Sequence, residues 1–357
     1  MKLALVTAAG LAFATPAVAA DVADDVEGRP ILRIVFARYD IFDTSQPETS
    51  KWFYRGANSL HIVSKESFLR SRLLFTEGDS YSTTLAEESA RTLRALGFIN
   101  PVLITARPVE GGVEVTVETH DQWTLQLGGA FGLIGSEEDW RLEFQEKNFL
   151  GLGTKLELEY GSDVERDETV LSYYDPNIAG SWWRTELSYA DRSDGFRELV
   201  RIERPFYALA TPHAMGGIWD RDHRVDHLYS EGDSVVSGQE EAEHAAIWYG
   251  FRLGGAGRVT RRLTLGFDHR HDIFAGWSWE ETGSPYPTPD DRRIDGPRVT
   301  YEQVTDHFEV LQGFRAWSIQ EDVALGPNLA AGLTLSLPAL GGDIPRLVLD
   351  GRFDMAS

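Results

Sequence analysis

The chain has 357 residues, no cysteine and a formal net charge of −22 at pH 7. Without cysteine, neither a disulfide framework nor a thiolate metal site can form. The excess of acidic side chains argues against broad nucleic-acid binding, which needs a cationic face to displace counterions. The length suffices for two or three ordinary domains or for one large β structure.

Residues 1–20 have the pattern of a secretory signal peptide. Lys2 provides the positive start, residues 3–13 the apolar core, and Ala17-Val18-Ala19 a small-residue cleavage site. A membrane anchor is the alternative, and it needs a longer apolar run. No later stretch reaches the roughly 18 consecutive apolar residues of a spanning helix. We therefore expect the protein to leave the cytoplasm, and to cross a membrane only with strands.

The pattern of residues 21–121 predicts a small α+β domain. Ser64 is the expected N-cap of its first well-marked helix. Thr84 and Glu87 have capping-box spacing at the start of the next helix, and Gly97 follows its end. The expected order is a strand at 31–42, a short helix at 52–60, helices at 64–74 and about 84–96, and strands at 100–107 and 113–119 joined by a hairpin loop.

A hairpin over residues 143–161 begins the second part of the chain, residues 122–357. Leu156, Leu158 and Tyr160 alternate with charged residues, which is typical of a strand with one apolar face. The turn before this strand contains Gly151 and Gly153, which are free to adopt positive φ.

Strands of the same kind continue to the end of the chain. From Trp123 onward we count about eleven or twelve segments, each near the roughly 10 residues of a tilted membrane-spanning strand. Aromatic pairs such as Trp182-Trp183 and Phe206-Tyr207 lie near segment ends, as in the aromatic girdles of membrane barrels. A soluble β-sandwich is the alternative, since its strands alternate as well. The signal peptide, the strand lengths and the acidic loops favour an antiparallel transmembrane β-barrel.

Several of these segments together resemble a known family. Residues 73–81, 93–98 and 112–117 look like a POTRA domain, and Asn148-Phe149-Leu150-Gly151 is similar to the motif at the start of a surface-antigen-type barrel. This order is typical of the BamA/TamA family of outer-membrane assembly factors. The resemblance covers about residues 75–161 well and the remainder only by its strand pattern.

The resemblance implies an outer-membrane protein with its N-terminal domain in the periplasm. It implies a role in inserting or exporting other proteins, without covalent chemistry. The expected partners are the lipid bilayer, unfolded outer-membrane or secreted client proteins, and periplasmic accessory proteins. A client strand would pair with the edge of the small domain by β-augmentation. The expected client-binding residues are Asn100, Val102, Leu103, Ile104, Thr105 and Ala106, and the expected barrel-start turn contains Asn148, Phe149, Leu150, Gly151 and Gly153.

Few residues suggest covalent chemistry. The runs 219–227 and 268–272 concentrate His and Asp, but their arginines disfavour a cation, so a solvated strand end or lumen wall is the preferred interpretation. Ser59 and His61 are two apart, and on a helix such residues do not face each other. We expect no catalytic residue, no metal and no cofactor. An outer-membrane channel or a barrel hydrolase remains the alternative function.

The end of the chain differs from the family pattern. The family's late loop motif, Arg-Gly followed by an aromatic residue, has no match, because Gly313-Phe314 lacks the arginine. The chain stops at Ser357 without the terminal aromatic strand that the family implies. An open sheet edge in lipid leaves backbone groups unpaired. The sequence therefore predicts that the natural chain continues past Ser357 by several strands.

Overall fold

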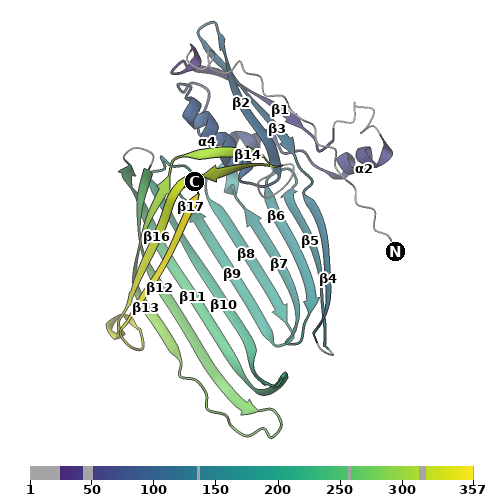
Figure 1. Cartoon of the computed structure of the whole chain (residues 1–357), viewed down its shortest axis with the longest axis vertical. Helices are drawn as coiled ribbons and strands as arrows, with labels where there is room; N and C mark the ends of the chain where they lie inside the picture. Colours follow the sequence, from purple (N-terminus) through teal and green to yellow (C-terminus); the bar gives the residue numbers. More distant parts are fainter. Residues whose placement is uncertain (1–24, 43–50, 135–136, 256–258, 313–318, 357) are drawn as a thin grey trace. The chain divides into compact units, whose positions relative to one another are not determined.

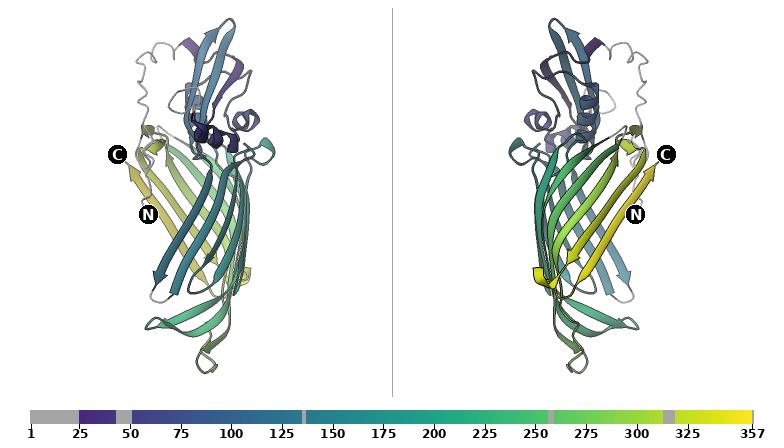
Figure 2. Two further views of the ribbon diagram at one scale, coloured as in Figure 1. Left: turned by 90° about the vertical axis from the view of Figure 1, so that its right-hand side faces the viewer. Right: turned by 90° about the vertical axis from the view of Figure 1, so that its left-hand side faces the viewer.

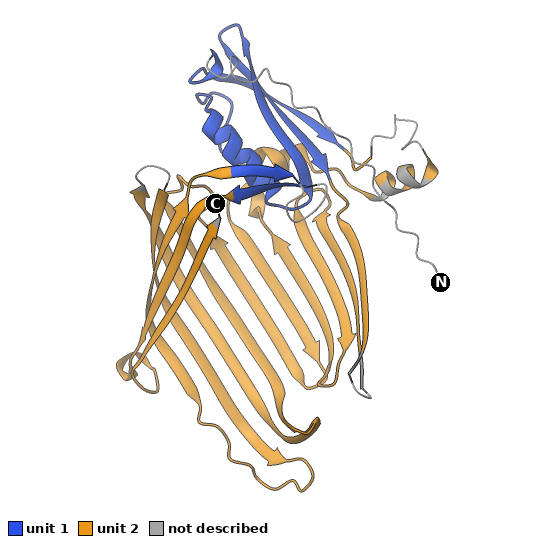
Figure 3. Ribbon diagram, in the orientation of Figure 1, with its two compact units in different colours: residues 1–39, 73–121, 309–323 blue, residues 40–72, 122–308, 324–357 orange. Residues whose placement is uncertain are grey.

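The computed structural model describes residues 25–42, 51–134, 137–255, 259–312 and 319–356. The predicted signal peptide and the Gly313-Phe314 pair lie outside these ranges. Contacts divide the chain into two compact units, coloured separately in Figure 3. Unit 1 comprises residues 1–39, 73–121 and 309–323, and unit 2 comprises residues 40–72, 122–308 and 324–357. The predicted domain boundaries at 20/21 and 121/122 stay predictions.

Unit 1 is built on a three-stranded sheet of order β1-β3-β2. Its strands are β1 (Ile31–Tyr39), β2 (Ile99–Val109) and β3 (Gly112–Asp121). β3 pairs in parallel with β1 and in antiparallel with β2. Helix α4 (Thr83–Arg94) packs against β2. Alternate residues of β3 are fully buried, as expected for a strand with one covered face. The buried core includes Ile31, Leu93, Ile99, Val113, Val115 and Val117.

Both predicted helix caps are wrong. Helix α3 spans only Glu66–Ser71, and its N-cap is Lys65, which makes no side-chain cap bond. Helix α4 is capped by Ser82, again without a side-chain bond. Instead, the backbone N–H of Thr83 donates to Glu27 Oε2 at 2.9 Å. A distant carboxylate therefore satisfies the first turn of α4.

Unit 2 holds helices α2 (Trp52–Leu60) and α3, and a twelve-stranded antiparallel meander (Figure 1). None of the described helices is both long enough and apolar enough to cross a membrane. A pair of short strands, β14 (Phe308–Gln312) and β15 (Gln320–Ala324), is inserted between β13 and β16 in the chain. The twelve strands are β4 (Leu125–Ile134), β5 (Glu137–Phe149), β6 (Thr154–Ser162), β7 (Asp167–Asp175), β8 (Arg184–Arg192), β9 (Gly195–Arg204), β10 (His213–Ser230), β11 (Asp233–Gly255), β12 (Val259–Trp279), β13 (Arg292–Thr305), β16 (Gly326–Ser336) and β17 (Arg346–Ala356).

One face of this sheet is apolar and exposed along all twelve strands. Because side chains alternate between faces, the register decides which residues share one. Here it aligns large apolar side chains in continuous rows: Leu127, Phe144, Leu158 and Leu171 across β4–β7, and Tyr249, Leu265, Val299, Leu333 and Leu349 across β11–β17. An exposed apolar area of this extent is typical of a lipid-facing surface.

The opposite face, the inner face, carries charges. Examples are Arg141, Glu143, Glu157 and Glu159 on β5–β6 and Arg201, Glu203, Arg262, Asp268 and Arg298 on β9–β13. The mainly β, membrane-type antiparallel fold that the sequence predicts is confirmed. Within the described residues the sheet is not closed, since β4 and β17 each have one neighbouring strand.

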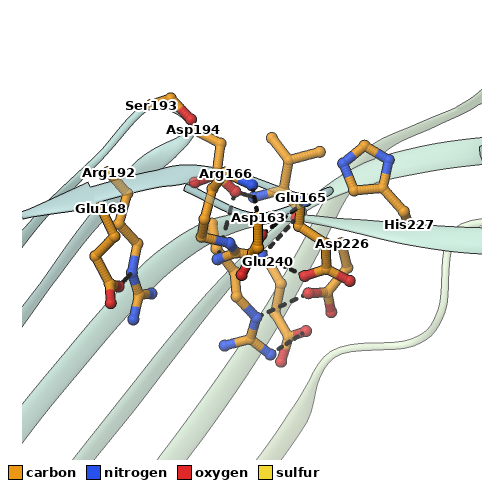
Figure 4. A network of polar contacts seen from close by, with 12 residues as sticks. Asp163, Glu165, Arg166, Glu168, Arg192, Ser193, Asp194, Asp226, His227 and Glu240 are labelled. Carbon is orange, nitrogen blue, oxygen red and sulfur yellow. Dashed lines mark hydrogen bonds and ion pairs between the residues drawn. The ribbon is translucent and has the colours of Figure 1, made fainter. Parts of the chain in front are cut away.

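Strands β10–β12 have 18, 23 and 21 residues, about twice the length of β6–β9 (Figures 1 and 2). A polar network joins the extended part to the turns beside it (Figure 4). Arg192 pairs with Glu168 and, at 2.7 Å, with Asp222. Arg224 reaches Glu240 at 2.9 Å. These ion pairs join β7 to β8, β8 to β10 and β10 to β11 beyond the apolar rows.

We expect the two faces to respond oppositely to the same substitution. Leu171 lies on the apolar face with 57% exposure, and its neighbour Val170 points to the inner face. Leu171→Arg should destabilise the vesicle-inserted protein by about 2–4 kcal/mol, because a guanidinium is placed in hydrocarbon. Val170→Arg is the matched control and should cost much less. Chemical unfolding from lipid vesicles measures both, and equal losses would contradict the assigned faces.

Candidate functional site

The predicted turn after β5 adopts the expected backbone. Gly151 and Gly153 have φ of 72° and 70°, and Leu150 also has a positive φ, 57°. The N–H of Gly151 donates to the carbonyl of Asn148 at 2.8 Å, and that of Leu152 to Phe149 at 3.2 Å. The turn thus places two consecutive residues in the left-handed region, which favours glycine at the second of them.

Asn148 connects this turn to the segment that leads into α3. Its side chain is 2% exposed. Its Nδ2 donates to Ser64 Oγ at 3.0 Å, and its Oδ1 accepts from the N–H of Gly153 at 2.8 Å. The N–H of Lys65 donates to the Gly151 carbonyl at 2.8 Å. Ser64, expected to cap the helix, is therefore fully buried as a partner of Asn148.

A second turn, between β7 and β8, repeats this geometry. Ala179 and Gly180 have φ of 52° and 76°, matching Leu150 and Gly151. The N–H of Gly180 donates to Asn177 at 3.0 Å, as Gly151 does to Asn148. In both turns a carboxylate two residues before the asparagine accepts from the asparagine N–H: Glu146 at 2.7 Å for Asn148 and Asp175 at 2.8 Å for Asn177.

The second turn binds the other end of α3. Asn177 Nδ2 donates to Ser71 Oγ at 2.6 Å. Arg72 Nη1 donates to the carbonyl of Pro176 at 3.0 Å, and its guanidinium lies 4.1 Å from the centre of the Trp182 ring. Burial lowers the pKa of Arg72 to about 10, so it remains charged at neutral pH. Trp182 in turn stacks on Tyr207, with ring centres 4.1 Å apart.

Helix α3 is consequently held at both ends by two turns of one type. The shared sequence is an acidic residue, any residue, Asn, two further residues and Gly, at 146–151 and at 175–180. Sequence reasoning found the first turn and missed the second. Comparing the two segments at this spacing would have revealed the repeat.

The edge of unit 1 at β2 is the second candidate site. In an antiparallel pair, alternate residues direct both backbone groups away from the partner strand. The carbonyl of Val102 accepts a side-chain bond from Arg94 Nη1 at 3.3 Å, and Pro108 has no N–H to give to a ladder. Both observations indicate that the even-numbered residues of β2, which include Ile104 and Ala106, point their backbone N–H and C=O groups away from β3. We call these the outward groups of β2. Leu103 and Thr105 then bond to β3.

Asn100 differs from the other expected client-binding residues. It is 3% exposed, and its side-chain amide bonds to the backbone of Gln320 within unit 1. Val102 is also buried, whereas Leu103 and Thr105 are exposed and Ile104 and Ala106 are half-buried. The accessible part of the edge therefore begins after Val102.

The residues considered for covalent chemistry have ordinary partners. Ser59 Oγ donates to the Gly56 carbonyl at 2.7 Å, and His61 lies 3.5 Å from Thr124 Oγ1. His269 lies 2.5 Å from Asp295, which also binds Arg293. Among the described residues, one group has three potential metal ligands close together: Glu143, Glu157 and Glu159. Lys155 and Arg141 already neutralise part of its charge.

Comparison with known proteins gives one sequence match. A segment of the chain is 29% identical over 116 residues to the outer membrane protein assembly factor BamA of Neorickettsia risticii (strain Illinois). The match covers 31% of this chain and 15% of that protein. No family model matches the chain.

Two solved structures are similar in outline. The crystal structure of BamA from Haemophilus ducreyi lacking POTRA domains 1–3 matches with a TM-score of 0.37 and 15% identity, over 91% of this chain and 51% of that one. CdiB from Acinetobacter baumannii matches with a TM-score of 0.36 and 10% identity, over 91% and 46%. TM-scores this low carry no argument about function.

The fold defines a membrane-type antiparallel β protein with a small α+β unit. The sequence match confirms the predicted resemblance to the BamA/TamA family. The chain spans 15% of the BamA sequence from Neorickettsia risticii and about half of each of the two solved chains.

We expect the two turns to differ in their tolerance of a methyl group. A Cβ at Gly153 would lie 2.2 Å from the Phe68 ring, whereas a Cβ at Gly180 would meet no atom within 4 Å. Gly180→Ala should cost about 1–2 kcal/mol of stability, from its positive φ. Gly153→Ala should cost clearly more, because the ring must move as well. Equal losses in chemical unfolding would show that α3 does not press on the first turn.

Proposed function

We propose that this chain is an outer-membrane protein that assists the insertion or secretion of other proteins by pairing with their strands. The observation that carries the proposal is the outward-directed backbone of β2, in an α+β unit joined to a membrane-type sheet. The partial sequence match to BamA supports it. On this proposal unit 1 lies in the periplasm, and the partners are the bilayer, unfolded clients and periplasmic accessory proteins.

Strand pairing provides the mechanism. An unfolded client segment would donate to and accept from the outward groups of Ile104 and Ala106, adding a fourth strand to the sheet. Its backbone groups would then be satisfied before they reach lipid, where an unpaired group costs several kcal/mol. The edge of the large sheet at β4 would offer the next pairing site as the client enters the bilayer.

A passive channel is the second candidate function. A cavity of about 660 Å³ opens on the inner face of the sheet. Charged side chains line it, among them Arg201, Glu203, His244, Asp268 and Arg270. A charged lumen wall conducts ions if the sheet closes around it. Ion conductance without any effect on client insertion would favour this function.

The assembly function is tested with the mature chain in lipid vesicles. A urea-denatured outer-membrane protein is added, and its protease-resistant fraction is measured. Ala106→Pro deletes one outward N–H of β2 and should reduce client capture about threefold to tenfold, since a hydrogen bond contributes about 0.5–1.5 kcal/mol.

Ala106→Val is the matched control, because it enlarges the side chain but keeps the N–H. It should capture clients as the unchanged chain does. Thr105→Pro should instead destabilise unit 1, because this N–H belongs to the ladder with β3. Unchanged capture by Ala106→Pro would contradict pairing at this edge.

A further inference from the structure

A strand from far along the sequence lies against the start of β2. Residues 309–323 count to unit 1 although they lie between β13 and β16 in the chain (Figure 3). Gln320 and Asp322 of their second strand, β15, contact Asn100 and Arg94 of the same unit. These contacts fall at the end of the edge assigned above to clients.

The contact at Gln320 imitates strand pairing. The N–H of Gln320 donates to Asn100 Oδ1 at 3.0 Å, and Asn100 Nδ2 donates to the Gln320 carbonyl at 2.8 Å. An antiparallel rung exchanges the same two bonds between facing residues. The side-chain amide of Asn100 thus replaces a backbone partner, and it is itself 3% exposed.

The contact at Asp322 is a buried ion pair. Arg94 Nε and Nη2 donate to the two carboxylate oxygens of Asp322 at 2.8 and 2.6 Å. The two side chains are 8% and 11% exposed. The third nitrogen of Arg94 donates to the carbonyl of Val102, the first outward group of the edge. Arg94 therefore binds β15 and β2 at once.

Gln320 and Asp322 are two residues apart, so on an extended strand their side chains share a face. Asn100 binds the backbone N–H and C=O of one residue, and Arg94 binds the carboxylate of the residue two positions later. Nothing in this recognition requires the ligand to belong to the same chain.

We propose that β15 is an internal occupant of the client edge, and that clients displace it. The favoured clients are extended segments with Asp or Glu two residues after the position that pairs with Asn100. This inference rests on the proposed function and adds its regulation and its specificity. While β15 is bound, the edge offers only its later part, at Ile104 and Ala106. Because β15 is tethered to the edge, it competes with clients at a high effective concentration. Release of β15 should therefore strongly increase the affinity of the edge for clients.

The test uses the full chain in detergent and a labelled peptide with the sequence of residues 319–325. Asp322→Asn removes the carboxylate that Arg94 binds and should tighten peptide binding about tenfold or more. Glu309→Gln is the matched control, since it removes one exposed charge from the same hairpin and should change nothing. A peptide with Asn in place of its Asp should lose most of the gain.

A second variant tests whether the effect of Asp322→Asn is due to misfolding. Gln320→Pro removes the N–H that Asn100 accepts and leaves Asp322 in place, and it should also tighten peptide binding. Equal affinities of the unchanged chain and both variants would overturn the proposal. If the variants bind the peptide more tightly but vesicle insertion never responds to Ala106→Pro, the assembly function fails and the internal occupant stands. If Ala106→Pro reduces vesicle insertion but neither variant alters peptide affinity, the assembly function stands and the proposal of an internal occupant fails.

Discussion

The pairing of backbone groups is the constraint on which this structure depends. In hydrocarbon each unpaired N–H or C=O costs several kcal/mol, so strands that enter lipid must be bonded on both sides. The large sheet satisfies this through ten inner strands and leaves a neighbour missing at β4 and β17 within the described residues. The small sheet of unit 1 ends at β2 in the same way, and its edge is accessible after Val102. In the proposed function, the unpaired backbone groups of a client strand bond to the unpaired groups at such a sheet edge.

The register of strand pairing decides which side chains face lipid. A slip of one residue would turn every side chain of a strand to the other face. Leu171 would then point into the charged inner face and Val170 into lipid. The two apolar rows, in β4–β7 and β11–β17, contain no such slip, although β5–β6, β10–β11 and β11–β12 contain local irregularities. These irregularities lie away from the aligned rows, so each row keeps its apolar side chains on one face.

Local patterns predicted much of this fold, and distant contacts account for what they missed. Alternation in 154–160 and the glycines at 151 and 153 depend on near neighbours, so the strand and the turn follow from the sequence. Ser64 was expected to cap a helix, but Asn148, distant in sequence, takes its hydroxyl. Asn100 was expected on a free edge, but Gln320 occupies it across 220 positions of the chain. No spacing rule within one segment reports a partner of this kind.

The central claim is that client strands pair with the outward groups of β2, and a cysteine scan tests it most directly. The chain has no cysteine, so a single cysteine introduced at one of residues 103–107 can form a disulfide only with a cysteine of the client. A set of client variants is used, and each variant carries one cysteine at a different position of the same strand. The account predicts crosslinks in one antiparallel register, in which each step along β2 moves the crosslinked client position one step back. Crosslinks without a register, or none along β2 while clients still insert, would contradict it.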